Sequence, residues 1–217
     1  MQVLFKFILI NPALSLGLIT SLCFIFYWHE LKGNDKMVGL LVFCYFSFDA
    51  YATYLAIQHT HNQWLYNVAI NIEVPLQIYI YWRISFASLK ILITGLFVFV
   101  INMINLFFGQ GLYVLNTFSY IPSLMVISLF SFMYLKTNFE RIEENPFNNF
   151  LFWFSAATLF DSIVSIPTIS LLSWFAFIYK DIAYKLIYLN KLVYSLWFLI
   201  IIIGLVWTSR QRKLLSL

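Results

Sequence analysis

Long apolar runs constrain this chain more than any other feature. Seven of them follow one another along the 217 residues, separated by short polar or charged breaks: 4–28, 37–57, 64–83, 89–108, 112–135, 149–173 and 185–208. Each run is close to the roughly 20 residues that an α-helix needs to cross the hydrocarbon core of a bilayer. We therefore expect an all-α fold, a polytopic bundle of seven transmembrane helices that forms one domain over residues 1–217.

The composition argues against a soluble protein and against a nucleic-acid partner. Charged residues make up 10% of the chain, against about 25% in soluble domains. The formal net charge is +4, but no basic cluster is longer than Arg210, Arg212 and Lys213 in the tail. The excess of basic residues therefore indicates membrane topology, and we expect the lipid bilayer and no nucleic acid as a partner.

The positions of lysine and arginine predict the orientation in the membrane. With the amino terminus outside, the outer side holds Lys6, Lys180 and Lys185, and Lys191 lies within the last run. The other nine basic residues then fall on the cytoplasmic side: Lys32, Lys36, Arg83, Lys90, Lys136, Arg141, Arg210, Arg212 and Lys213. Because cytoplasmic loops carry an excess of lysine and arginine, we expect a multi-pass protein of the cell inner membrane with its carboxyl terminus in the cytoplasm.

Four ionisable residues lie inside the apolar runs: Asp49, Glu73, Asp161 and Lys191. Such residues are energetically costly in a membrane, usually face the interior of a bundle, and are candidates for function. The three acids fall near the middle of their runs, and Lys191 lies about two helical turns from the outer surface.

Two amide residues accompany these charges. Gln77 shares a helix face with Glu73, and Asn71 adds a further polar group in the same run. We expect the four ionisable residues, Asn71 and Gln77 to line a polar cavity that opens to the outside and binds a small ligand or a cation.

A structural role for the same polar residues stays open. Three acids and one base leave two carboxyl groups that must be protonated, hydrated or neutralised by a cation. In the structural alternative Lys191 pairs with one acid, the other acids are protonated, and amide side chains tie the helices together.

The sequence lacks the residues that several known kinds of site require. His29 falls at the cytoplasmic face and His59 and His61 in an outer loop, so we expect no metal site and no cofactor. A resemblance to microbial rhodopsins would require an aspartate four residues before Lys191, where Ile187 stands. There is no GxSxG motif for a serine hydrolase.

Carboxyl groups could still act as an acid and base pair. In its size and its acids within helices the chain resembles lysoplasmalogenase-like membrane enzymes, which would make Asp49 and Asp161 the pair. We assign no catalytic residue on this basis.

Three short segments carry a second resemblance: Asn71-Ile72-Glu73, Asn145-Pro146-Phe147 followed by Phe152-Trp153, and the basic tail. With these segments the chain resembles small bacterial seven-helix membrane proteins, some of which are encoded beside two-component sensor kinases. The resemblance implies a receptor-like or signalling accessory protein that acts through a cytoplasmic or membrane partner. The charged segment of Glu140, Arg141, Glu143 and Glu144 is a candidate contact for that partner.

Two alternative functions would use the same polar residues. One is a small transporter or an ion- or proton-translocating protein, in which Pro75, Pro122 and Pro167 within the runs would be hinges rather than fixed kinks. The other is a lipid-cleaving hydrolase that uses carboxyl groups. Signalling requires conformational change without flux, transport requires flux, and hydrolysis requires lipid turnover.

Overall fold

The computed structural model describes residues 11–85, 88–111, 113–114, 116–140, 145–175 and 178–215. These residues form seven α-helices and one short 3-10 helix, η1 (Pro146–Asn148). The α-helices are α2 (Pro12–Tyr27), α3 (Gly33–Ile57), α4 (Gln63–Ile84), α5 (Leu89–Phe108), α6 (Thr117–Glu140), α7 (Phe150–Phe175) and α8 (Lys180–Leu215). The expected all-α fold is confirmed.

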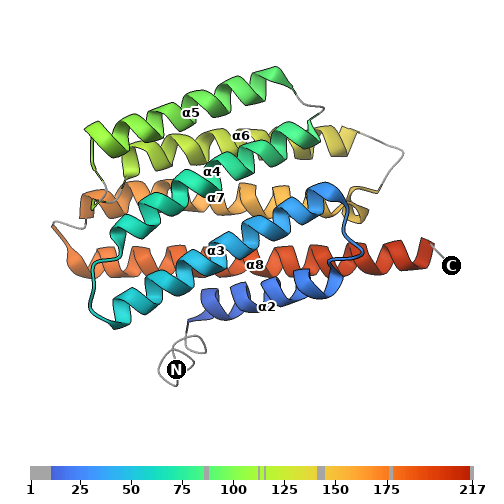
Figure 1. The fold of residues 1–217 in the computed structure, drawn as a ribbon, viewed down its shortest axis with the longest axis horizontal. Helices are drawn as coiled ribbons and strands as arrows, with labels where there is room; N and C mark the ends of the chain where they lie inside the picture. The colour runs from blue at the N-terminus through green and yellow to red at the C-terminus, as the bar shows by residue number, and fades with distance from the viewer. Residues whose placement is uncertain are drawn as a thin grey trace.

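The helices lie side by side in two layers, and consecutive helices run in opposite directions (Figure 1). One layer contains α2, α3, α4 and α5, and the other contains α6, α7 and α8. At the two edges α2 packs against α8 and α5 packs against α6, while α3 contacts α7 and α4 contacts α6 between the layers. The interior of the bundle is therefore formed mainly by α3, α4, α6, α7 and α8.

Five of the described helices are long and apolar enough to cross a membrane: α3, α5, α6, α7 and α8. Helix α2 is apolar but has 16 residues, and residues 4–10 of the expected first run 4–28 lie outside the described part of the chain. Helix α4 has 22 residues and is less apolar, because it carries Asn67, Asn71, Glu73 and Gln77. The five apolar helices indicate a membrane protein.

The start of α6 differs from the expected run 112–135. The backbone N–H of Asn116 donates to Asn67 Oδ1 over 3.2 Å, and Asn67 Nδ2 donates to the carbonyl of Val114 over 2.7 Å. These bonds hold Val114 and Asn116, neither of which is helical, against α4. At its other end α6 continues to Glu140, which pairs with Lys136 one turn earlier over 3.7 Å.

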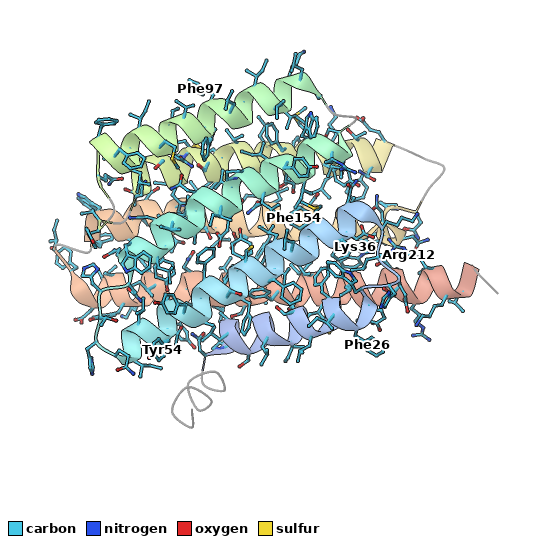
Figure 2. All side chains as sticks on the ribbon, viewed as in Figure 1. Phe26, Lys36, Tyr54, Phe97, Phe154 and Arg212 are labelled. Atoms are coloured by element: carbon cyan, nitrogen blue, oxygen red, sulfur yellow. The ribbon has the colours of Figure 1, made fainter. Side chains whose placement is uncertain are left out.

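Helix α8 extends beyond the expected run 185–208 at both ends. Its carboxyl-terminal turns leave the apolar part of the bundle and contact the α2–α3 turn. Arg212 Nη2 lies 2.7 Å from Asp35 Oδ2, and Arg212 Nη1 donates to the carbonyl of Glu30 over 3.1 Å. Lys213 Nζ lies 2.9 Å from Glu30 Oε1. We call Glu30, Asp35, Arg212 and Lys213 the terminal clamp; Figure 2 labels Arg212 beside Lys36 at this end of the bundle.

Small residues allow close approach of neighbouring helices. A Cβ atom on Gly204 of α8 would overlap the side chain of Trp153 on α7, and one on Gly95 of α5 would overlap Ile78 on α4. Such contacts are typical of helix pairs in membranes, where packing rather than water exclusion holds helices together. The two glycines therefore set the α7–α8 and α4–α5 distances.

Candidate functional site

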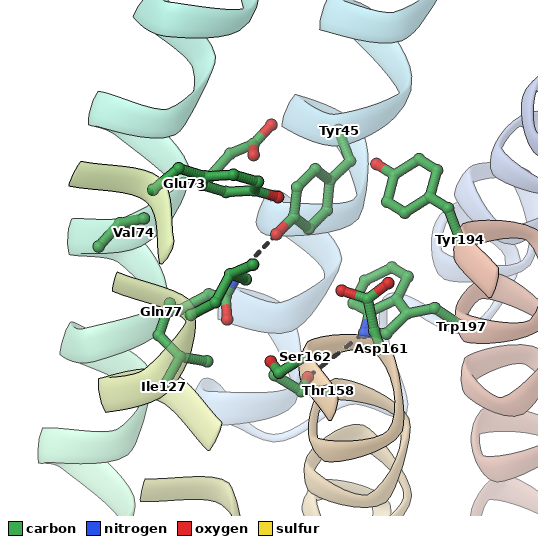
Figure 3. Close-up of a pocket in the computed structure, with 12 residues that line it drawn as sticks. Tyr45, Glu73, Val74, Gln77, Ile127, Thr158, Asp161, Ser162, Tyr194 and Trp197 are labelled. Carbon is green, nitrogen blue, oxygen red and sulfur yellow. Dashed lines mark hydrogen bonds between the residues drawn. The ribbon is translucent and has the colours of Figure 1, made fainter. Parts of the chain in front are cut away.

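A small cavity lies between the two layers of the bundle (Figure 3). Its volume is about 10 Å³, measured as the space open to the centre of a water molecule, which is close to what one water requires. Five helices contribute its lining: Tyr45 from α3, Glu73, Val74 and Gln77 from α4, Tyr120, Leu124 and Ile127 from α6, Thr158, Asp161 and Ser162 from α7, and Tyr194 and Trp197 from α8. We call it the central cavity.

Two carboxyl groups line the central cavity without a basic partner. Glu73 is buried at the middle of α4 and makes no hydrogen bond with a described residue. Asp161 is half-buried, and its Oδ1 accepts a hydrogen bond from Ser165 Oγ over 3.3 Å. Neither group forms an ion pair with a described lysine, arginine or histidine, although the two acids interact electrostatically. The lining of the cavity therefore contains no basic side chain that would balance the charge of either acid when it is ionised.

Two neutral oxygen atoms at the same cavity also have no partner. Gln77 Oε1 and Ser162 Oγ are buried and make no hydrogen bond with the described residues. The amide nitrogen of Gln77 donates to the hydroxyl of Tyr45, another residue of the lining, over 2.5 Å. A buried polar atom without a partner costs about 1–3 kcal/mol, so each of these two oxygens is energetically costly unless a polar group contacts it.

Aromatic side chains close the cavity toward α8. Tyr45 makes edge-to-face contacts with Tyr194 and Trp197, with ring centroids 5.5 Å and 5.3 Å apart. Trp197 Nε1 donates to Thr158 Oγ1 over 3.3 Å, which ties α8 to α7 beside the cavity. The wall on this side of the cavity is therefore mainly aromatic.

Three of the six residues expected at the site line the central cavity: Glu73, Gln77 and Asp161. The other three lie elsewhere. Asp49 is half-buried on α3 and interacts electrostatically with Lys191, which is exposed on α8 and forms no ion pair with a described residue. Asn71 lies on α4 outside the lining and donates to the carbonyl of Asn67 over 2.8 Å.

Other cavity residues are not singled out by the sequence. Tyr120 and Tyr194 are two of 14 tyrosines in a chain rich in aromatic residues, so the sequence does not distinguish them from the other tyrosines. Ser162 directly follows Asp161, and adjacent residues on a helix do not share a face, so periodicity does not connect them. The tyrosine at position 45 does have a signal, because it lies one turn before Asp49 on the same face.

Asn102, Asn105 and Asn116 take part in separate hydrogen bonds between α5 and the start of α6. Asn105 Nδ2 donates to Asn116 Oδ1 and, over 3.1 Å, to Ser119 Oγ. Asn102 and Ser123 exchange hydrogen bonds over 3.2 Å. This network ties α5 to α6 and is not part of the central cavity.

The described residues contain no cluster of three or more histidine, cysteine, aspartate or glutamate side chains that could hold a metal ion. Of the charged segment expected to contact a partner, Glu140 pairs with Lys136, while Arg141, Glu143 and Glu144 lie outside the described residues. Comparisons with protein-family models, with curated proteins and with solved structures find no match.

Proposed function

We propose that this chain is a seven-span protein of the cell inner membrane that moves a proton or a small cation through its central cavity. The observation that carries the proposal is the pair Glu73 and Asp161, which faces a cavity the size of one water molecule with no basic side chain in the lining. Ionisable residues inside membrane helices characteristically mark ion and proton pathways. Acids without a partner are suited to this task because they can take up and release a positive charge.

The volume of the central cavity favours an ion over a larger ligand. Sites for small organic molecules have volumes of about 300–1,000 Å³, whereas this cavity measures about 10 Å³. A lipid-cleaving enzyme would likewise need access for an ester or ether group to both acids. Ion translocation therefore accounts for the site better than a receptor for an organic ligand or a lipid hydrolase.

The distribution of basic residues over the helix ends supports the proposed orientation in the membrane. The start of α3, the end of α4, the start of α5 and the ends of α6 and α8 lie at one side of the bundle (Figure 1). These ends carry Lys36, Arg83, Lys90, Lys136 and Arg212. Their concentration at one side supports a cytoplasmic carboxyl terminus and, with seven spans, an outer amino terminus.

Two prolines provide a route to movement around the cavity. Pro75 lies inside α4 two residues after Glu73, and Pro167 lies inside α7 six residues after Asp161. Proline removes one backbone hydrogen bond from a helix and weakens it locally. Small rotations at these positions would expose the two acids to one side of the membrane and then to the other.

Flux measurements on liposomes containing the purified full chain test the proposal. We expect a pH or cation gradient to dissipate faster than in empty liposomes, and Glu73→Gln or Asp161→Asn to abolish the difference. Asp181→Asn is the matched control, because Asp181 is an exposed acid at the start of α8, away from the cavity. Wild-type flux equal to that of empty liposomes, or full flux in both cavity variants, would overturn the proposal.

A further inference from the structure

We infer that Asp49 is the outer partner of Glu73, and that these two carboxyl groups pass one proton between the outer side of the bundle and the central cavity. The inference rests on the proposed function: it names the ion as a proton and adds a residue that does not line the cavity. Two independent observations carry it, the register of α3 against α4 and α8, and the direction in which the Glu73 side chain points.

A hydrogen bond fixes the register of α3 against α4. Gln77 Nε2 donates to the hydroxyl of Tyr45 over 2.5 Å, and the two helices run in opposite directions (Figure 1). Asp49 follows Tyr45 by one turn, and Glu73 precedes Gln77 by one turn, so both steps lead toward the turn that joins α3 to α4. Because residues four apart share a helix face, Asp49 and Glu73 lie at one level, one turn from the contact of Tyr45 with Gln77.

The carboxyl group of Glu73 is directed toward that level. Figure 3 shows it pointing away from Gln77 and Asp161. Away from Gln77 along α4 is the direction of the α3–α4 turn, in which Asp49 lies. Glu73 accordingly interacts electrostatically with Asp49 more strongly than with Asp161. Glu73 therefore lines the central cavity with its side chain and extends its carboxyl group toward Asp49.

A second contact places Lys191 beside Asp49. The rings of Tyr45 and Tyr194 are 5.5 Å apart, and α8 runs opposite to α3 (Figure 1). Lys191 precedes Tyr194 by three residues, so it lies on the same side of this contact as Asp49, and the two charges interact electrostatically. Glu73 is 9% exposed, Asp49 is half-buried and Lys191 is exposed. These three residues therefore lead from the interior of the bundle to its surface, on the outer side in the proposed orientation.

The proton transfer balances atoms and charge with these groups and water. The O–H bond of protonated Asp49 breaks as an O–H bond forms on the ionised carboxyl group of Glu73, and Asp49 takes its next proton from water at the outer side. Lys191 stabilises the intervening carboxylate of Asp49, because an opposite charge nearby favours an ionised group. Asp49 also interacts with Tyr66 and Tyr194, which are phenols and neutral near pH 7.

A proton accounts for this arrangement better than a metal ion. Two carboxyl groups suffice for a proton, because one donates the O–H that the other accepts, whereas ions such as Ca²⁺ and Mg²⁺ take about six or more oxygen ligands. The positive charge of Lys191 also opposes a metal ion at Asp49, since like charges repel. Asp49 and Glu73 repel each other when both are ionised, so the pair favours a state in which one of them holds a proton.

Proton flux through liposomes that contain the purified full chain and a pH-sensitive dye tests the inference. We expect Asp49→Asn to slow the flux about a hundredfold and Asp49→Glu to retain it, because the carboxyl group is kept. Lys191→Gln should slow the flux about tenfold, since the carboxylate of Asp49 then lacks its nearby positive charge. Asp181→Asn is the matched control, because Asp181 is an exposed acid at the start of α8.

Infrared spectroscopy of the same protein in lipid nanodiscs tests the pair without flux. The carbonyl band of a protonated carboxyl group that disappears in Glu73→Gln belongs to Glu73, and its pH titration can be followed in the other variants. Two interacting acids titrate as a pair. We therefore expect the midpoint of this band to move by about one pH unit in Asp49→Asn and to stay unchanged in Asp181→Asn.

The outcomes separate this inference from the proposed function. Proton flux that depends on Glu73 but is unchanged in Asp49→Asn would overturn the inference and leave the proposed function intact, as would flux of Na⁺ or K⁺ without flux of protons. Slow flux in both Asp49→Asn and Asp49→Glu, with an unmoved Glu73 midpoint, would assign Asp49 a structural role and overturn the inference. A moved midpoint in a protein without flux would support the pair of Asp49 and Glu73 and overturn the proposed function.

Discussion

The terminal clamp and the central cavity both bury a carboxyl group, but they treat its charge in opposite ways. Asp35 in the clamp is 3% exposed and lies 2.7 Å from the guanidinium group of Arg212. Glu73 in the cavity is 9% exposed and has neither an ion pair nor a hydrogen bond with the described residues. Asp35, which joins the two ends of the fold, thus has a counterion, whereas Glu73 at the centre of the bundle has none. A permanent counterion is suited to holding helices together, whereas its absence is suited to reversible binding of a cation.

Removing the counterion of the clamp should have the largest effect on stability. Arg212→Met leaves Asp35 buried and unpaired, and breaking a buried pair from one side costs about 3–5 kcal/mol. Because Arg212 is 28% exposed, we expect the lower end, a loss of about 3 kcal/mol in the free energy of unfolding. Unfolding in mixed detergent micelles, followed by circular dichroism, measures it. If Arg212→Met left the free energy of unfolding unchanged within error, Asp35 would not depend on its counterion and would not differ from Glu73 in this respect.

Removing both partners of the clamp should recover much of this loss. In the double variant Asp35→Leu with Arg212→Met no buried charge remains unpaired, and apolar replacement of an ion pair is often tolerated. We expect the double variant to be about 2 kcal/mol more stable than Arg212→Met alone. A double-mutant cycle with Asp35→Leu supplies the coupling energy. Purely additive losses would show that the two side chains do not act as a pair.

Neutralising the central acid should change stability in the other direction. Glu73→Gln replaces a carboxyl group, whose ionised form would be buried and would interact unfavourably with Asp49 and Asp161, by a neutral amide of similar size. We therefore expect the free energy of unfolding to rise by about 1 kcal/mol, while flux in liposomes disappears. The same detergent unfolding assay and the liposome assay together check this. A marked loss of stability would instead assign Glu73 a structural role.

The exposed pair of α6 should have the smallest effect and provides the reference for both regions. The side chains of Lys136 and Glu140 are 63% and 65% exposed, so solvent screens their attraction. We expect Lys136→Ala to change the free energy of unfolding by less than about 0.5 kcal/mol. A change comparable to that of Arg212→Met would mean that burial is not what separates the clamp from surface pairs.

Much of the helical framework could be predicted from the sequence, because hydrophobic length is a local property. The expected run 89–108 coincides with α5, and Pro75, Pro122 and Pro167 lie inside helices as expected. The start of α6 was not predictable, since it depends on hydrogen bonds from Asn67, about 50 residues earlier in the chain. Local hydropathy carries no information about such a partner.

The candidate site, too, could be predicted from the sequence only in part. Glu73 and Gln77 are one turn apart on α4, so their common face follows from helical periodicity alone. Whether Asp161 joins them, and whether Lys191 faces inward, depends on how α7 and α8 are rotated against α4. The helices place Asp161 at the central cavity and leave Lys191 exposed. Rotation about a helix axis is decided by packing at glycines and aromatic side chains, and the sequence does not reveal it.

The sequence by itself determined that the chain forms apolar helices and which acids these helices carry, because length, hydropathy and periodicity are properties of neighbouring residues. Only the tertiary structure decided which acid obtains a counterion. Arg212 and Asp35 are 177 residues apart and meet because α8 returns beside α2. Glu73 lines one cavity with Asp161 and two unpartnered oxygens because two layers of helices pack around that cavity. Charges interact over a few ångströms in space, whatever their separation along the chain.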